Sequence, residues 1–368
     1  MSWAVWITGL PGSGKSVIAR AAAAAIRARG QDVSLVELDE MRRLVTPSPT
    51  YSDGERDLVY RGLVYVAATL VNAGAPVIID ATGHRREWRD LGRAVLPAFA
   101  EVQLHCPLDV CRDRERARVP GNAPVGIYAG AGRAGARVPG VDVPYELAAM
   151  PELTIDTTRE TASAAAARVA DLAAKFPQPP RRAAMSHWAV WITGLPGSGK
   201  TTIATHVAEA LRARGVAAHV LDFADVRDFL CHGAVTPLAE DIAHRVLIYA
   251  AKRLAEAGVA AIVDATAPAR RWRDLARSLI ERFAEVQLVC PESLCATRER
   301  AGRWRLIGCG EGVVARRTTT APDVVVAYEH AVNPELTIYT HVEDRWSAVD
   351  SVLRLTARLQ ADEGVRLA

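Results

Sequence analysis

Two glycine-rich segments of this chain could hold the phosphates of a nucleotide, and they are nearly identical. Each has an apolar run followed by G-x-x-x-x-G-K-[ST], from Trp3 to Ser16 in the first and from Trp188 to Thr201 in the second. Such glycines let the backbone approach phosphate oxygens closely, and the following helix N-terminus favours anions. The spacing therefore predicts two phosphate-binding loops (P-loops).

Both loops are expected to bind ATP, with Mg²⁺ as the cofactor. The predicted ATP-binding residues are Gly9, Gly12, Ser13, Gly14, Lys15 and Ser16 in the first copy, and Gly194, Gly197, Ser198, Gly199, Lys200 and Thr201 in the second. We expect Lys15 to be catalytic, because it would stabilise charge on the transferring phosphoryl group. The hydroxyls of Ser16 and Thr201 are predicted to ligate the metal.

Polar residues after the next predicted strand could act on the acceptor. Asp39 could orient Mg²⁺ or take a proton from an attacking hydroxyl, and Arg42, about one helical turn later, could clamp an anionic substrate. The alternative is an ordinary helix N-terminus with favourable acidic residues.

Asp80 ends the third predicted strand, where an acid could lie close to the metal and the substrate. The arginines that follow, Arg85, Arg86 and Arg89, could face an anionic substrate or form a solvated helix face.

Arg114 belongs to a cluster of arginines after the fourth strand, and a Gly-rich stretch follows from Gly121 to Gly140. Arginines leading into a flexible segment suggest a lid that closes over the triphosphate. A disordered basic loop is the alternative.

Composition limits the classes of protein. The chain has 368 residues, a net charge of +3 and six cysteines. We expect a cytoplasmic protein, without membrane spans and without the basic character of a nucleic-acid binder. Cys106 and Cys111, and Cys290 and Cys295 at the same spacing, are interpreted as packing residues rather than metal ligands.

Short apolar strands alternate with helical stretches in both copies, which predicts an α/β fold with two tandem P-loop domains, each a parallel five-stranded sheet sandwiched by helices. The first domain is predicted at 1–175, a Pro-rich linker at 176–187 and the second domain at 188–368. The predicted strands are Trp3–Thr8, Val33–Leu38, Pro76–Asp80, Val102–His105 and Leu153–Ile155, then Trp188–Thr193, Ala218–Leu221, Ala260–Asp264, Val286–Val289 and Leu336–Tyr339.

The first copy resembles the adenylylsulfate kinase family along nearly its whole length. The matching segments, in order, are Gly9–Ser16, Glu37–Arg42, Tyr51–Arg56, Pro107–Cys111, Gly126–Ala131, Gly140–Glu146 and Met150–Leu153. The resemblance implies transfer of the ATP γ-phosphate to the 3′-hydroxyl of adenosine 5′-phosphosulfate (APS), giving PAPS in sulfate assimilation. It also implies that Asp39 is catalytic, and that Arg42 and Arg56 hold the anionic groups of the acceptor. Asp80, at its strand end, is a further candidate substrate-binding residue.

This chain departs from the family pattern at several positions. In the first copy, Val59 and Val138 replace an asparagine and an aromatic residue, and Ala129 and Gly130 replace lid lysines. These changes bear on the acceptor more than on phosphoryl transfer.

The second copy departs further. Ala224 stands where the first copy has Asp39, and Glu240 where it has Arg56, while Arg227 matches Arg42 as a candidate substrate residue. The lid tyrosine has no clear equivalent there. This copy is therefore expected to bind nucleotide, with its catalysis in question.

Several functions stay open from the sequence. The acceptor could be APS, another modified nucleotide, a specialised metabolite or, by similarity of the Asp80 strand tip to polynucleotide-kinase-like proteins, a 5′-hydroxyl. The second copy could be a regulatory nucleotide-binding module. The two halves of the chain could pair internally, or the chain could homodimerise.

Overall fold

The computed structural model describes residues 2–118, 126–133, 135–179, 187–231, 236–305 and 328–366, without the side chains of 300–305 and 362–366. The chain divides into two compact units, Met1–Arg181 with Phe229–Ile242, and Arg182–Asp228 with Ala243–Ala368. None of the described helices is both long and apolar enough to cross a membrane.

The first sheet has five parallel strands in the order β2-β3-β1-β4-β5. Its strands are β1 (Ala4–Thr8), β2 (Ser34–Glu37), β3 (Val77–Asp80), β4 (Phe99–His105) and β5 (Leu153–Asp156). Its helices are α1 (Lys15–Ala28), α2 (Leu38–Val45), α3 (Asp53–Asn72), α4 (Arg86–Val95), α5 (Leu108–Arg116), the short 3₁₀ turn η1 (Ile127–Gly130) and α6 (Ala162–Ala173).

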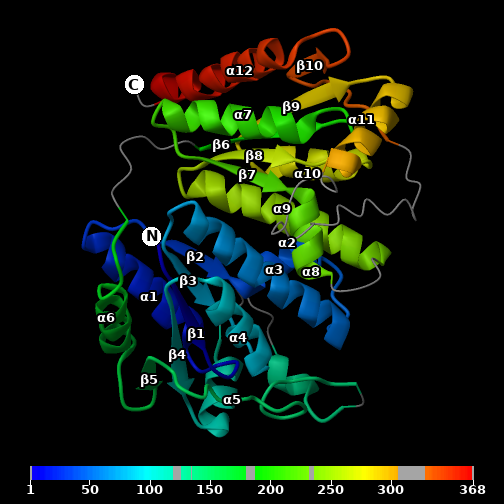
Figure 1. The fold of residues 1–368 in the computed structure, drawn as a ribbon. Coiled ribbons are helices and arrows are strands. Elements are labelled where there is room, and N and C mark those ends of the chain that lie inside the picture. The colour runs from blue at the N-terminus through cyan, green and yellow to red at the C-terminus, as the bar shows by residue number, and fades with distance from the viewer. Residues whose placement is uncertain are drawn as a thin grey trace. The chain divides into compact units, whose positions relative to one another are not determined.

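Helices cover both faces of this sheet (Figure 1). On one face α1 and α6 share a core with β1, formed by small side chains such as Ala22 and Ala166 that let the helices approach closely. On the other face α3 packs against β3, and α4 packs against β4. Because all five strands run parallel, their carboxyl ends meet at one edge, where Thr8, Glu37 and Asp80 end their strands.

The second unit repeats this architecture. Its parallel sheet has the order β10-β9-β6-β8-β7. Its elements are β6 (Trp188–Thr193), α7 (Lys200–Ala213), β7 (Ala218–Asp222), α8 (Phe223–Leu230), α9 (Pro237–Glu256), β8 (Ala260–Asp264), α10 (Arg270–Leu279), β9 (Arg282–Val289), α11 (Glu292–Arg305), β10 (Leu336–Tyr339) and α12 (Arg345–Arg366). The predicted fold of two tandem parallel five-stranded sheets is confirmed.

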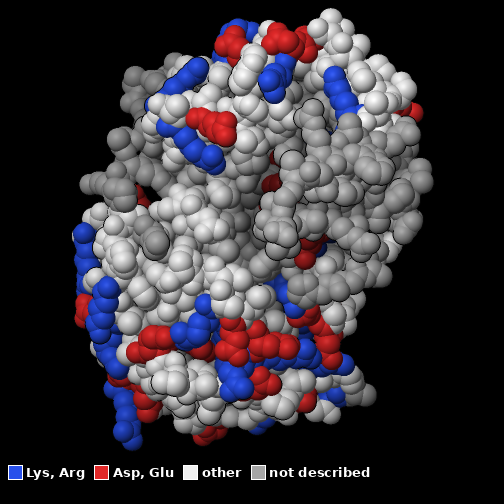
Figure 2. Space-filling model, in the orientation of Figure 1, with Lys and Arg blue, Asp and Glu red and all other residues white. Residues whose placement is uncertain are grey.

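Charged side chains of both signs are mixed on the surface of the first unit. Figure 2 shows acidic and basic side chains lying side by side in the lower half of the view. Ion pairs of this unit include Arg61–Asp57 at 2.9 Å and Arg86–Asp90 at 3.6 Å.

Candidate active site

Glycines of the first P-loop adopt unusual backbone conformations, and one of them lets the loop contact α5 closely. Gly12 and Gly14 have φ values of 79° and 99°, a region that L side chains rarely adopt. A Cβ built on Gly12 would lie 2.3 Å from the carbonyl oxygen of Cys111, and one on Gly197 would lie 2.3 Å from that of Cys295. Each loop therefore rests on the helix that carries this cysteine, α5 in the first copy and α11 in the second.

A cavity of about 550 Å³ opens above the first loop. Of the residues predicted to bind ATP, it is lined by Gly12, Gly14, Lys15, Ser16 and Arg114. Gly9 lies at the start of the loop, and Ser13 is fully buried in it. Asp39, Asp80 and Arg118 also line this cavity, which we call the nucleotide cavity.

Lys15, Ser16 and Asp80 lie together at its floor. Lys15 Nζ donates a hydrogen bond to the carbonyl oxygen of Leu10 at 2.9 Å, and burial lowers the pKa of this lysine. Burial raises the pKa of Asp80 to about 6, against the charge of Lys15 and a hydrogen bond with the Ser16 side chain. A hydroxyl paired with a carboxylate supplies the oxygen ligands that Mg²⁺ prefers, so these residues fit the metal.

A second cavity, of about 430 Å³, adjoins the first. We call it the acceptor cavity, and it is lined by Arg42, Tyr51, Arg56, Tyr60, His84, Arg137 and Val138, among others. Asp39 lines both cavities, with Pro11, Leu38, Thr82 and Ile127. Asp39 lies in the first turn of α2, and burial raises its pKa, opposed by the charges of Lys15 and Arg42.

Two arginines predicted to bind substrate flank one aromatic ring in the acceptor cavity. The guanidinium of Arg42 lies 5.5 Å from the ring centre of Tyr51, and that of Arg56 lies 5.9 Å from it. Tyr51 has a φ of 55°, which is uncommon for a residue with a side chain. Arg56 Nη2 donates to the carbonyl oxygen of Arg137 at 2.9 Å, and Arg42 pairs with Glu55 at 3.8 Å.

Sequence reasoning assigned no role to Tyr60, Thr82 or His84. The ring of Tyr60 stacks on Trp88 at 4.0 Å, and its hydroxyl accepts a hydrogen bond from the Gly83 N–H at 3.0 Å. His84 is 4% exposed, and burial lowers its pKa to about 4, aided by the charge of Arg56. His84 follows the strand-end residue Asp80 by four positions, so the sequence could have indicated it as a site residue. Tyr60 lies on the buried face of α3, and no sequence pattern indicated a role for it.

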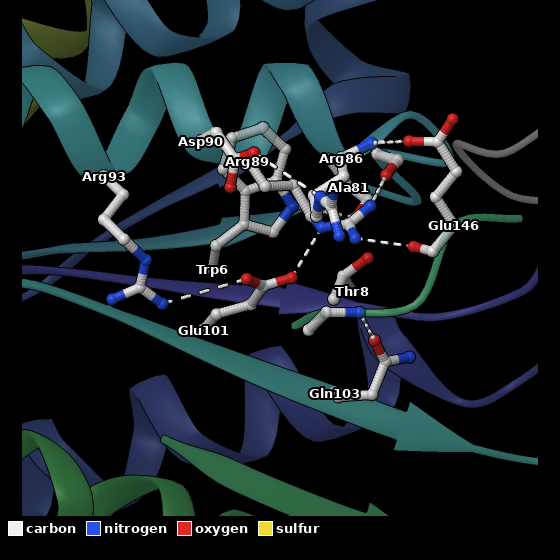
Figure 3. A network of polar contacts seen from close by, with 12 residues as sticks. Trp6, Thr8, Ala81, Arg86, Arg89, Asp90, Arg93, Glu101, Gln103 and Glu146 are labelled. Atoms are coloured by element: carbon white, nitrogen blue, oxygen red, sulfur yellow. Dashed lines mark hydrogen bonds and ion pairs between the residues drawn. The ribbon is translucent and has the colours of Figure 1, made fainter. Parts of the chain in front are cut away.

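Arg89 is neither a substrate residue nor part of a solvated face. It is fully buried, and its Nε donates to Glu101 of β4 at 2.5 Å while Nη2 donates to the carbonyl oxygen of Glu146 at 2.6 Å. Figure 3 shows the guanidinium pointing into this polar network. Arg89 also donates to the carbonyl oxygen of Gly83, so it holds the segment after β3 on which His84 stands.

Arg114 links the nucleotide cavity to the end of β5. Its Nη2 donates to the carbonyl oxygen of Thr157 at 2.8 Å, and its Nη1 donates to the Thr157 hydroxyl at 3.0 Å. Of the predicted lid at 121–140, positions 121–125 and 134 lie outside the described residues. Within the described part, the Tyr128 hydroxyl donates to the carbonyl oxygen of Pro11 at 2.8 Å, which ties η1 to the P-loop.

The second copy keeps the P-loop geometry. Lys200 Nζ donates to the carbonyl oxygens of Gly194 and Leu195, both at 3.1 Å. Asp264 is 4% exposed and forms a side-chain hydrogen bond with Thr201, as Asp80 does with Ser16. Gly199 is the N-cap residue directly before α7, and Ser198 is fully buried.

The acceptor side of the second copy differs. Ala224 replaces Asp39, and Phe223 stacks on His244 with ring centres 3.9 Å apart. His244 stacks in turn on Trp272 at 3.7 Å, in the arrangement that Tyr60 and Trp88 have in the first copy. Arg227 pairs with its neighbour Asp228 at 3.6 Å. The counterpart of the segment 140–146 falls mostly at 323–327, outside the described residues.

Known proteins resemble both copies. A family model described as adenylylsulphate kinase matches residues 1–156 and 186–339. A probable adenylyl-sulfate kinase of Archaeoglobus fulgidus is 32% identical over 160 residues, which are 43% of this chain and 98% of that protein. The bifunctional enzyme NodQ of Azospirillum brasilense is 37% identical over 172 residues, 46% of this chain and 26% of that protein.

Coverage of these relatives is uneven. A probable bifunctional SAT/APS kinase of Sorangium cellulosum is 32% identical over 180 residues, which are 49% of this chain and 30% of that protein. The chain therefore spans less than a third of this relative and of NodQ. Among solved structures, the Mycobacterium tuberculosis APS kinase in complex with AMPPNP and APS is 30% identical and covers 46% of this chain and 96% of its own, with a TM-score of 0.40. With more than half of its residues matched by the family model, the chain belongs to the adenylylsulphate kinase family, in two tandem copies.

Proposed function

We propose that the first copy transfers the γ-phosphate of ATP to the 3′-hydroxyl of APS, giving PAPS and ADP. One observation supports this above the others: Asp39 is the titratable side chain, among those described, that lines both the nucleotide cavity and the acceptor cavity. A carboxylate at that junction can reach a hydroxyl presented from one side and a phosphate presented from the other.

The chain's own residues supply positioning and charge. The P-loop N–H groups and Lys15 bind the phosphates, and Mg²⁺ held by Ser16 and Asp80 would neutralise charge on the β- and γ-oxygens. Asp39 accepts the proton of the acceptor hydroxyl as its oxygen bonds to Pγ, and ADP leaves with the electron pair of the broken P–O bond. Burial favours this role, because the raised pKa makes Asp39 a stronger base than an exposed aspartate.

The acceptor cavity carries complementary charge. Arg42 and Arg56 can hold the phosphate and sulfate oxygens of APS, and the rings of Tyr51 and His84 offer apolar walls to a base. Val138 supplies an aliphatic side chain where the family resemblance leads one to expect an aromatic one. A direct assay with APS tests this acceptor.

That assay follows ADP release from Mg²⁺-ATP with and without APS. We expect APS-dependent release in the full chain, its loss in Lys15→Ala and its retention in Lys200→Ala. If the full chain binds nucleotide but releases no ADP in response to APS, the acceptor is a different hydroxyl compound.

For the second copy we propose a nucleotide-binding module that does not transfer phosphate. Its loop, Lys200 and Thr201 are in place, but Ala224 removes the candidate base and the Phe223–His244–Trp272 stack replaces the Leu38–Tyr60–Trp88 set. Ala224→Asp in a Lys15→Ala chain tests this. APS-dependent turnover in the double variant would show that the second copy lacked only the carboxylate. Turnover in the Lys15→Ala chain without Ala224→Asp would contradict the proposal.

A further inference from the structure

Glu115 is a buried carboxylate at the end of α5, and it contacts both the start of η1 and the side chain of Arg118. It is 2% exposed. Its Oε1 accepts hydrogen bonds from the N–H groups of Gly126 at 2.7 Å and Ile127 at 3.1 Å, at the start of the η1 segment. The same oxygen pairs with the guanidinium of Arg118 at 3.5 Å. The position of Arg118 is therefore coupled to that of the η1 segment.

The other end of this coupling is the P-loop. Tyr128 of η1 donates its hydroxyl hydrogen bond to Pro11 in the loop at 2.8 Å. Ile127 lines both the nucleotide cavity and the acceptor cavity. The η1 segment therefore lies across the junction of the two cavities, and Glu115 attaches it to α5.

Arg118 adds positive charge to the nucleotide cavity. It lines the nucleotide cavity together with Lys15 and Asp39. Arg118 therefore shares one cavity with the lysine that would bind the phosphates and with the candidate base.

We propose that Arg118 is a catalytic residue of the first copy, which stabilises the negative charge on the transferring phosphoryl group, and that Glu115 is its positioning residue. This inference rests on the proposed phosphoryl transfer. Arg118 exchanges no proton, and acts by hydrogen bonds that are stronger in the transition state than with bound ATP. The side chain would add a second positive charge to that of Lys15 in the same cavity.

The sequence of the second copy agrees with this division of roles. Glu299 occupies the position of Glu115, and Gly302 occupies that of Arg118. The copy that lacks a counterpart of the candidate base Asp39 thus also lacks the proposed arginine, while it keeps a carboxylate at the position of Glu115.

The test uses full-length chains that carry Lys200→Ala, so that nucleotide binding reports the first copy. Arg118→Ala, Arg118→Lys and Glu115→Gln are compared with Arg116→Ala, whose side chain is 75% exposed and paired with Asp113 at 3.0 Å. Two quantities are measured: kcat with KM for APS-dependent ADP release, and the affinities for ADP and for ADP with aluminium fluoride, which mimics the transferring group.

We expect Arg118→Ala to lower kcat by about 100-fold or more, with ADP affinity and KM within a few-fold. The tighter binding of ADP with aluminium fluoride over ADP alone should be lost in the same variant. Arg118→Lys should recover part of kcat and part of the tighter binding of ADP with aluminium fluoride. Glu115→Gln should give values between those of the parent and of Arg118→Ala, and Arg116→Ala should match its parent.

Two results would overturn the inference: an unchanged kcat in Arg118→Ala, or a loss of ADP affinity as large as the loss of kcat, which would make the role structural. The aluminium fluoride comparison needs no acceptor. It therefore decides the role of Arg118 even if the parent chain proves inactive with APS, which would count against the proposed acceptor only.

Discussion

At the scale of single residues, Asp39 decides between binding and transfer. Asp39→Asn keeps the size of the side chain but removes the group that would accept the proton of the acceptor hydroxyl. We expect kcat for ADP release to fall by about 100- to 10,000-fold. ADP affinity, measured by calorimetry, should change little, because the P-loop supplies the phosphate contacts. A variant with unchanged kcat would assign the base elsewhere.

His84 makes the first unit sensitive to acid. Its pKa is lowered to about 4 in the folded chain, from 6.5 when unperturbed. Since the folded state binds the proton less readily than the unfolded state, this group stabilises the fold above pH 6.5, and the contribution falls as the pH drops toward 4. Between pH 7 and pH 5 the loss should be about 2 kcal/mol.

The measurement is urea unfolding at both pH values, comparing the full chain with His84→Gln. The variant should lose less stability than the parent over this interval. Equal losses in both would mean that other groups cause the acid sensitivity.

The sequence located Lys15, Ser16 and Asp39 within the candidate site, but it did not locate some of the residues that form the walls around them. Lys15, Ser16 and Asp39 belong to segments whose spacing is tied to one chemistry, so their positions followed from the pattern. His84 and Tyr60 reach the acceptor cavity only because Trp88 and the buried Arg89 fix the segment after β3, and these contacts join residues from separate elements. No local pattern encodes such contacts.

At the scale of elements, the P-loop depends on its contact with α5. Gly12 and Gly30 have nearly the same φ, 79° and 81°, but a Cβ on Gly30 would meet nothing within 4 Å. We expect Gly30→Ala to cost about 1–2 kcal/mol through backbone strain alone. Gly12→Ala should cost more and abolish ADP binding at the first site, since the new Cβ must displace the loop from Cys111.

Calorimetry and urea unfolding of both variants provide the check. Equal stability and normal ADP binding in Gly12→Ala would show that the loop does not rest on α5 as described.

The buried Arg89–Glu101 pair should stabilise the same edge of the sheet. Removing one partner of a buried ion pair leaves a charge without compensation, so Glu101→Gln should destabilise the first unit by about 3–5 kcal/mol. Arg86→Ala, which removes an exposed pair with Asp90, should change stability by less than about 1 kcal/mol. The free energy of unfolding distinguishes them, and a similar small effect for both would rule out a stabilising role for the buried pair.

Glu101 also explains where strand prediction erred. The fourth strand was predicted to begin at Val102, but β4 begins at Phe99, and its counterpart β9 begins at Arg282 rather than Val286. A charged residue interrupts the apolar run in each case. Glu101 and Glu285 are nevertheless buried, because Arg89 and Arg273 neutralise them at 2.5 and 2.6 Å.

At the scale of the whole chain, the duplication was visible in the sequence because the two P-loops and their flanking strands are nearly identical. The parallel sheets followed from strand–helix alternation, since parallel strands need crossover connections. The predicted linker starts at Phe176, but its first residues contact the first unit. Phe176 stacks on Trp3 with ring centres 6.1 Å apart, and the side-chain oxygen of Gln178 accepts a hydrogen bond from the indole N–H of Trp3 at 3.3 Å. Pro-rich composition did not reveal this docking of the segment's first residues.

The two loops predict two nucleotide sites per chain. Because Lys15 and Lys200 make equivalent contacts with their own loops, the full chain should bind two ADP molecules in calorimetry with Mg²⁺. Lys15→Ala and Lys200→Ala should each reduce the stoichiometry to one, and only the first should abolish transfer. Since binding to the folded state alone stabilises it, each variant should also lose the ADP-dependent rise in the unfolding temperature of its own unit. A stoichiometry of one in the full chain, unchanged by Lys200→Ala, would mean that the second loop preserves its geometry without binding nucleotide.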